Sequence, residues 1–278
     1  MPQGKFIKRL EEISAGASPS IGFKASQVAM PPALLLTVVL PAIDAEHAAA
    51  AIEGGAEALI VRVSLQEAAK EEASLKEVLA AAGGKPCGFV PVGPWVHGTE
   101  RLQRLQSLGF DFVVISAHDT PDVMCLENVG KVMLVDHTFD NDLIRTINDL
   151  SVDAVEVFLG RPEDFGKHFS IRDLMQYKLY RMLLRKPIIV RGERSIKPED
   201  VAGLCDVGVE GLVIDATVTG SDPQTIKEGI ASYTEAIHKL GPAARKKRDK
   251  VAPIIPSVKP SIGGHSGEPE EPEEPDEI

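Results

Sequence analysis

Eight short apolar runs divide the chain, and a stretch long enough for a helix follows each of them. Four of the runs open in the same way, with a turn residue, one spacer, an acid and then apolar residues. The acids of these four runs are Glu57, Asp111, Asp153 and Glu210. The remaining runs lack the acid and cover 34–40, 87–92, 131–135 and 187–190. The repeat, roughly 40 to 57 residues long, is the size of one β-α-β-α quarter, so the sequence predicts an α/β fold, a closed (βα)8 or TIM barrel.

Helical periodicity appears between the runs and before the first of them. Residues 5–14 place apolar side chains on one side, and such a helix is expected to plug the N-terminal end of the barrel. Glycines follow several of the periodic stretches, as they do at helix ends. The helices expected between strands cover 45–54, 65–82, 98–108, 122–129, 140–149, 171–185, 198–206 and 222–240.

Three regions follow from this pattern. We expect an N-terminal helix with an irregular segment over 1–33 and the barrel over 34–241. Residues 242–278 are rich in Pro and Glu, cannot bury enough apolar area to offset their ordering entropy, and are predicted to be a disordered tail. The connection 161–170 is long for a βα loop, so either a lid or an ordinary surface excursion fits it.

Composition narrows the class of protein. The 278 residues carry a net charge of −11, which argues against a nucleic-acid partner and against adhesion to an anionic membrane. The first residues lack the apolar core of a signal peptide, and the most apolar run is too short and too rich in proline to be a membrane helix. The three cysteines form no close pair, which predicts buried thiols in a reducing, cytoplasmic setting.

Strand alternation predicts which side chains enter the barrel. If the acid of each repeat faces outward, the first, third and fifth residues after it face inward. The resulting layer nearest the C-terminal ends of the strands, where barrel active sites lie, contains Arg62, Ser116, Phe158 and Asp215. Glu156 lies one layer deeper among apolar neighbours. A buried carboxylate must be paired or functional, so Glu156 is either an acid/base candidate or the partner of a barrel arginine.

Other polar residues follow the strands at the same end. Trp95 could stack on a ligand, and His118 and His137 could move protons. His97 and Asp136 could join these histidines around a divalent ion, but no two lie at a tight ligand spacing, so we assign no metal site.

Arginines gather at this end of an otherwise acidic protein. They are Arg62, Arg161, Arg191 and Arg194. Positive charge focused in one mouth attracts a small anion, and the guanidinium fork fits a carboxylate or phosphate, so we predict an anionic small-molecule substrate.

The last two βα units resemble a known family. Residues 191–204, which begin Arg-Gly-Glu-Arg-Ser-Ile, and residues 208–214 are similar to the aldolase-type, phosphate-binding barrels, especially indole-3-glycerol-phosphate synthase. The resemblance implies a (βα)8 fold and aligns Glu193 with a catalytic glutamate of that family. The chain lacks the family's lysine at the end of the third strand, and Asp215 replaces a glycine of the phosphate site, where its carboxylate would repel a phosphate.

Three functions remain open on the sequence. The first is a lyase or isomerase that acts on an anionic metabolite, with Glu156, Glu193 and Asp215 as acid/base groups. The second is a flavin-dependent oxidoreductase, and the third is a non-catalytic barrel that binds a ligand or serves in an assembly. The sequence names no cofactor. It leaves open a homo-oligomer and a tail that docks a protein partner.

Overall fold

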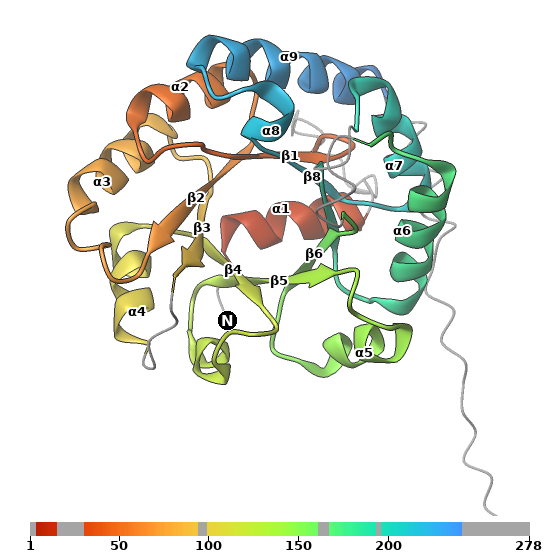
Figure 1. The fold of residues 1–278 in the computed structure, drawn as a ribbon, viewed down its shortest axis with the longest axis horizontal. Coiled ribbons are helices and arrows are strands. Elements are labelled where there is room, and N and C mark those ends of the chain that lie inside the picture. Colours follow the sequence, from red (N-terminus) through yellow and green to blue (C-terminus); the bar gives the residue numbers. More distant parts are fainter. Residues whose placement is uncertain (1–3, 16–30, 94–98, 161–166, 193–195, 241–278) are drawn as a thin grey trace, which may run out of the picture.

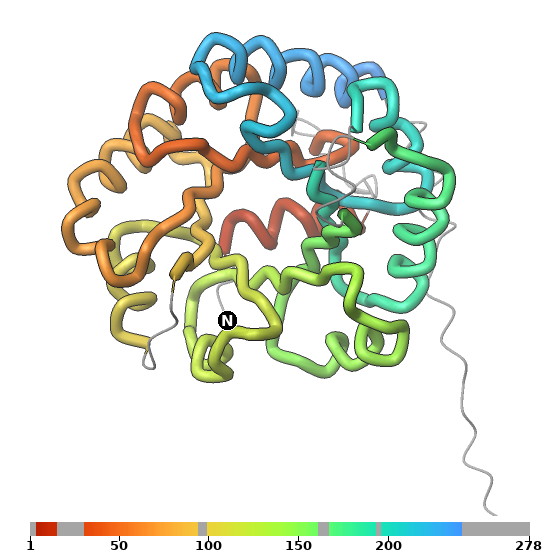
Figure 2. The backbone as a smooth tube through the Cα atoms, in the orientation of Figure 1, coloured from red at the N-terminus to blue at the C-terminus, as the bar shows by residue number. Residues whose placement is uncertain are grey.

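Eight parallel strands close into a barrel in the order β1 to β8, with helices around the outside (Figures 1 and 2). The structure is a computed structural model that describes residues 4–15, 31–93, 99–160, 167–192 and 196–240. The strands are β1 Leu35–Val39, β2 Ala58–Ser64, β3 Cys87–Val92, β4 Phe112–Ser116, β5 Gly130–Asp136, β6 Ala154–Phe158, β7 Ile188–Arg191 and β8 Gly211–Ile214. The predicted fold class is confirmed.

Helices cover the outer face of the barrel, and one further helix lies across its N-terminal end. The α-helices are α1 Lys5–Ser14, α2 Ala45–Glu53, α3 Glu72–Ala81, α4 Glu100–Leu108, α5 Asn141–Thr146, α6 Ile171–Leu183, α7 Val201–Val207, α8 Ala216–Thr219 and α9 Pro223–Lys239. Short 3-10 turns lie at Pro121–Cys125, Ile147–Asp149 and Pro198–Asp200. Outward side chains of the strands pack against the surrounding helices in one continuous apolar core.

The inward direction of the side chains is the one that the repeat predicts. A separate apolar cluster fills the barrel and contains Ala58, Ile60, Phe112, Val114 and Val213. These residues are the first and third after the acids of their repeats, so the acids lie on the other side of each strand.

Helix α1 closes the N-terminal end of the barrel, as predicted (Figure 1). The ring of Phe6 stacks on that of Phe112, with centroids 3.9 Å apart and 12° between the ring planes. The carboxylate of Asp111 accepts hydrogen bonds from the backbone N–H groups of Lys5 and Phe6, both at 2.7 Å. An acid of the repeat thus satisfies two of the free N–H groups at the start of α1.

Two other acids of the repeat tie neighbouring strands together at their starting ends. Asp153 accepts from the Lys131 N–H at 2.8 Å, and Glu210 accepts from the Ile188 N–H at 2.7 Å. The fourth acid, Glu57, has a buried Oε2 without a hydrogen-bond partner among the described residues. Three of the four recurring acids, Asp111, Asp153 and Glu210, therefore have a structural role at the end opposite to the mouth.

Several predicted elements differ in extent. Helix α3 begins at Glu72 and not at residue 65, because 65–71 form turns. The helix expected over 122–129 is a single 3-10 turn, Pro121–Cys125, and Asn128 then adopts a left-handed φ of 56° that ends any helix. Of the three thiols, only two are buried as expected, since Cys125 is exposed.

Candidate active site at the barrel mouth

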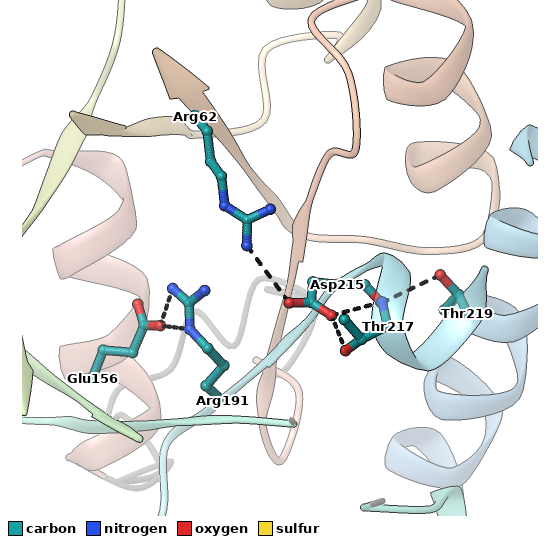
Figure 3. Close-up of polar contacts among 6 residues, drawn as sticks. All are labelled: Arg62, Glu156, Arg191, Asp215, Thr217 and Thr219. Carbon is teal, nitrogen blue, oxygen red and sulfur yellow. Dashed lines mark hydrogen bonds and ion pairs between the residues drawn. The ribbon is translucent and has the colours of Figure 1, made fainter. Parts of the chain in front are cut away.

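Four charged side chains face one another where the strands end (Figure 3). Arg62 comes from β2, Glu156 from β6, Arg191 from β7, and Asp215 follows β8 directly. Alternation along the strands turns these side chains inward, into the space above the apolar cluster. The structure therefore brings together four of the residues that the sequence singled out.

Glu156 and Arg191 form a buried ion pair. Both the Nε and a terminal nitrogen of Arg191 contact Oε1 of Glu156. Glu156 is 0% exposed and Arg191 is 8% exposed. Oε2 of Glu156 has no hydrogen-bond partner among the described residues. A buried carboxylate with one unused oxygen costs stability, so packing alone does not explain its presence in an otherwise apolar barrel.

Arg62 and Asp215 form a second, more open pair. A terminal nitrogen of Arg62 lies 3.7 Å from Oδ2 of Asp215, and the Arg62 side chain is 48% exposed while that of Asp215 is 5% exposed. This separation exceeds that of a charge-assisted hydrogen bond, so the guanidinium keeps donors for a further anion.

Asp215 also caps the short helix α8. Its Oδ1 accepts from the Thr217 N–H at 2.9 Å and from the Thr217 hydroxyl (Figure 3). In many (βα)8 barrels a phosphate binds between the loops after strands 7 and 8 and the start of such a helix. Here the Asp215 carboxylate accepts the Thr217 N–H at the start of α8, so this described half of the position does not offer that donor to the phosphate of a substrate or of a flavin.

The fourth strand leads into a tight turn that engages Ser116, a residue of the predicted inward layer, and His118. Ser116 donates its N–H to Oδ2 of Asp119 at 2.6 Å, and its Oγ accepts from the His118 N–H at 3.2 Å. Burial raises the pKa of Asp119, although the hydrogen bond from Ser116 and the nearby His118 oppose this. His118 itself is exposed.

His118 and His137 flank Asp136, which ends β5. Both histidines are exposed, and both interact electrostatically with the Asp136 carboxylate. Burial acts to raise the pKa of Asp136, but hydrogen bonds from the Thr138 N–H and hydroxyl, together with the histidines, bring it below its usual value. Within the described ranges, no group of three His, Cys, Asp or Glu side chains is placed to hold a metal ion.

Five predicted residues lie outside the described residues. They are Trp95, His97, Arg161, Glu193 and Arg194. Most of the loop proposed as a lid lies there as well. Their part in the site stays a prediction.

Sequence reasoning missed a histidine clip beside the mouth. Nδ1 of His47 lies 2.6 Å from Oδ2 of Asp44, and Nε2 lies 2.9 Å from the Ser221 carbonyl oxygen. Desolvation alone would lower the pKa of His47, but the hydrogen bonds to these acceptors raise it. The clip joins the start of α2 to the connection between α8 and α9. The only sequence signal was Asp44 three residues before His47, a spacing typical of a helix cap, and Asp44 does accept the His47 N–H at the start of α2.

No helix in the described part of the chain is long and apolar enough to cross a membrane.

No protein-family model matches the chain, and no curated protein is detectably similar in sequence. Solved structures share the fold. Thiamine phosphate pyrophosphorylase from Pyrococcus furiosus aligns with 75% of this chain and 97% of its own, at 14% identity and a TM-score of 0.55. A 3-hexulose-6-phosphate synthase aligns with 73% and 100%, at 16% identity and a TM-score of 0.54. Phosphoribosyl anthranilate isomerase from Thermus thermophilus aligns with 74% and 100%, at 12% identity and a TM-score of 0.54. The chain thus shares the (βα)8 barrel fold of these enzymes, whereas its resemblance to the aldolase-type family and to indole-3-glycerol-phosphate synthase stays a prediction.

Proposed function

We propose that the protein is a lyase or isomerase that acts on a small anionic metabolite in the barrel mouth by acid/base chemistry. The observation that carries the proposal is Glu156, which is wholly buried, held through Oε1 by Arg191, and without a partner at Oε2. A carboxylate oriented through one oxygen and unused at the other is suited to exchange a proton with a substrate.

The neighbouring groups have distinct roles in this proposal. Arg191 is a positioning residue, because it fixes the Glu156 carboxylate and offsets its charge. Arg62, which is half exposed, binds the substrate anion, and Asp215 orients Arg62. His118 or His137 relays protons between the site and solvent, since both are exposed at the rim.

The test compares metabolite turnover by the wild type and by Glu156→Gln. Each purified protein is incubated with a metabolite extract, and mass spectrometry follows consumption and formation of compounds. We expect wild type to convert at least one anionic metabolite, and Glu156→Gln to slow that conversion at least 100-fold, as loss of a general acid/base does.

Glu53→Gln is the matched control. Glu53 is an exposed glutamate on α2, paired with Lys227 at 2.7 Å, so this substitution makes the same chemical change away from the mouth. Conversion by Glu156→Gln at the rate of the control would refute the assignment of Glu156.

A non-catalytic barrel is the second candidate, and the capping of α8 by Asp215 favours it. A barrel that has given up its phosphate position could bind a ligand or serve in an assembly. Deletion of residues 243–278 separates the two, because a scaffold that docks through its tail would lose its partner while an enzyme would keep its turnover. The same capping counts against a flavin, and absence of flavin absorbance in the purified protein would remove that option.

A further inference from the structure

We propose that the barrel mouth takes an unphosphorylated hydroxycarboxylate, whose carboxylate meets Arg62 and whose hydroxyl group reaches Oε2 of Glu156. This inference rests on the proposed function and narrows its substrate class. Three observations lead to this inference, and they concern in turn a phosphate, a carboxylate and a hydroxyl group of the ligand.

The first observation disfavours a phosphate. Asp215 is 5% exposed, and its Oδ1 already receives the Thr217 N–H and hydroxyl. Its other oxygen lies 3.7 Å from Arg62. A phosphate bound at Arg62 would bring about −1.5 to −2 charges beside the buried Asp215 carboxylate, so it would meet a larger repulsion than a singly charged carboxylate does. The Thr217 N–H, which Asp215 already binds, would not be free to offset that repulsion.

The second observation calls for a carboxylate. Asp215 is the only ion-pair partner that the described residues provide for Arg62, and it lies beyond charge-assisted hydrogen-bond distance. The half-exposed guanidinium can therefore turn its planar donors toward a ligand. A carboxylate matches these donors with two parallel hydrogen bonds and brings a single negative charge.

The third observation calls for a neutral hydrogen-bond donor. Oε2 of Glu156 is buried and has no partner in the described part of the chain. An ammonium group would satisfy this oxygen but would approach the positive charge of Arg191, which already neutralises Glu156. A hydroxyl donates to the carboxylate without adding charge. Because Glu156 lies one layer deeper than Arg62, the hydroxyl enters first and the carboxylate stays at the rim.

The experiment uses four three-carbon probes that differ by one group each. Glycerate carries both groups, propionate lacks the hydroxyls, glycerol lacks the carboxylate, and 3-phosphoglycerate adds a phosphate. Ligand-observed NMR titrations of the full chain give their dissociation constants. We expect glycerate to bind at least 10-fold more tightly than each of the other three.

Two site variants and a control identify the groups responsible. Arg62→Gln should weaken glycerate at least 10-fold. Glu156→Gln should bring glycerate and propionate within about threefold of each other. Arg104→Gln should change nothing, because Arg104 is an exposed arginine that pairs with Glu72 on the outside of the barrel. Circular dichroism confirms that each variant is folded.

The outcomes separate this inference from the proposed function. Arg62-dependent binding of 3-phosphoglycerate, as tight as glycerate or tighter, would overturn the substrate class and leave the enzyme proposal in place. Absence of glycerate binding at tens of millimolar, or binding that Arg62→Gln does not weaken, would also overturn it. Arg62-dependent glycerate binding beside unchanged turnover by Glu156→Gln would support the substrate class and refute the catalytic role.

Discussion

Removal of the arginine from the buried pair should destabilise the fold strongly. Arg191→Met takes away the only hydrogen-bond partner that the described residues give Glu156, which is 0% exposed. Breaking a buried pair from one side typically costs about 3–5 kcal/mol, because the remaining charge stays desolvated. For a chain of this size each kcal/mol corresponds to about 2–4 °C, so the melting temperature should fall by roughly 6–20 °C.

The double variant Glu156→Met with Arg191→Met makes the prediction specific. When both charges are replaced by apolar groups of similar length, neither charge of the pair is left without its partner, and such replacements are often neutral or stabilising. We therefore expect the double variant to lie within about 2 kcal/mol of the wild type, and to be more stable than Arg191→Met alone.

Urea denaturation followed by circular dichroism measures these free energies of unfolding. Arg145→Met is the control, since Arg145 pairs with Asp142 on the surface and both side chains are largely exposed. That change should cost at most about 1 kcal/mol. The single variant Glu156→Met completes the cycle. If the double variant loses as much stability as Arg191→Met and Glu156→Met together, the two residues are not coupled, and the account of the site as a desolvated pair is wrong.

Three further predictions concern the rest of the barrel. Both ring nitrogens of His47 face acceptors, Asp44 and the Ser221 carbonyl, so both hydrogen bonds form only when the ring is protonated. Because the pKa of His47 is raised in the folded state, the stabilisation of the fold by this clip is complete below pH about 6.5 and is lost as pH rises through the folded-state pKa. His47→Gln should therefore lower stability at pH 5.5 more than at pH 8.5 in urea denaturation, and equal losses at both would contradict the clip. Asp111→Asn should cost about 1–3 kcal/mol and speed hydrogen exchange in α1, whose first N–H groups it binds, whereas unchanged exchange would show that the cap is dispensable. Thr37→Val should raise the free energy of unfolding by up to about 1 kcal/mol, because the Thr37 hydroxyl is buried without a described partner, and a loss of similar size would reveal a bound water.

The fold could be predicted from the sequence because the barrel repeats one geometry four times. Each copy has an acid at a fixed distance before an apolar run, and strand alternation then determines which side chains point inward. The inward direction of Ala58, Phe112 and Val213 follows from this pattern and is confirmed by the inner cluster. No pattern indicated what the acids bind, because their partners, the N–H groups of Lys131 and Ile188 among them, belong to neighbouring strands 22 residues away.

Hydrophobic periodicity could not predict the shortest helix. Helix α8 has four residues, Ala216–Thr219, which is little more than one turn and cannot show an amphipathic pattern. Its one signal was Asp215 two residues before Thr217, a spacing typical of a helix cap. We interpreted Asp215 as a group of the mouth only, while the structure shows that it also caps α8.

The sequence narrowed the ion-pair partner of Glu156 to two arginines but did not identify which of them it is. Glu156 was expected either to act in catalysis or to pair with Arg62 or Arg191, and the contact with Arg191 joins residues 35 positions apart. That choice depends on the stagger of adjacent strands, which places Glu156 beside Ile189 and thus close to Arg191. The pattern of hydrophobic positions does not report the stagger between two strands.

We expect substitutions at the closed end of the barrel to affect stability, and substitutions at the mouth to affect ligand binding. At the closed end a Cβ on Gly88 would lie 2.3 Å from the ring of Phe112, and one on Gly211 would lie 3.4 Å from Leu10, so small residues there make room for α1 and the ring that it covers. Because α1 supplies apolar filling from below, the upper layers need not be filled by large apolar side chains, and the charged pairs occupy that space. Substitutions such as Gly88→Ala should therefore lower the free energy of unfolding without changing the relative affinities of glycerate and propionate. Substitutions at the mouth should change those affinities, and a Gly88→Ala variant that remained folded yet reversed the preference would show that the two ends are coupled.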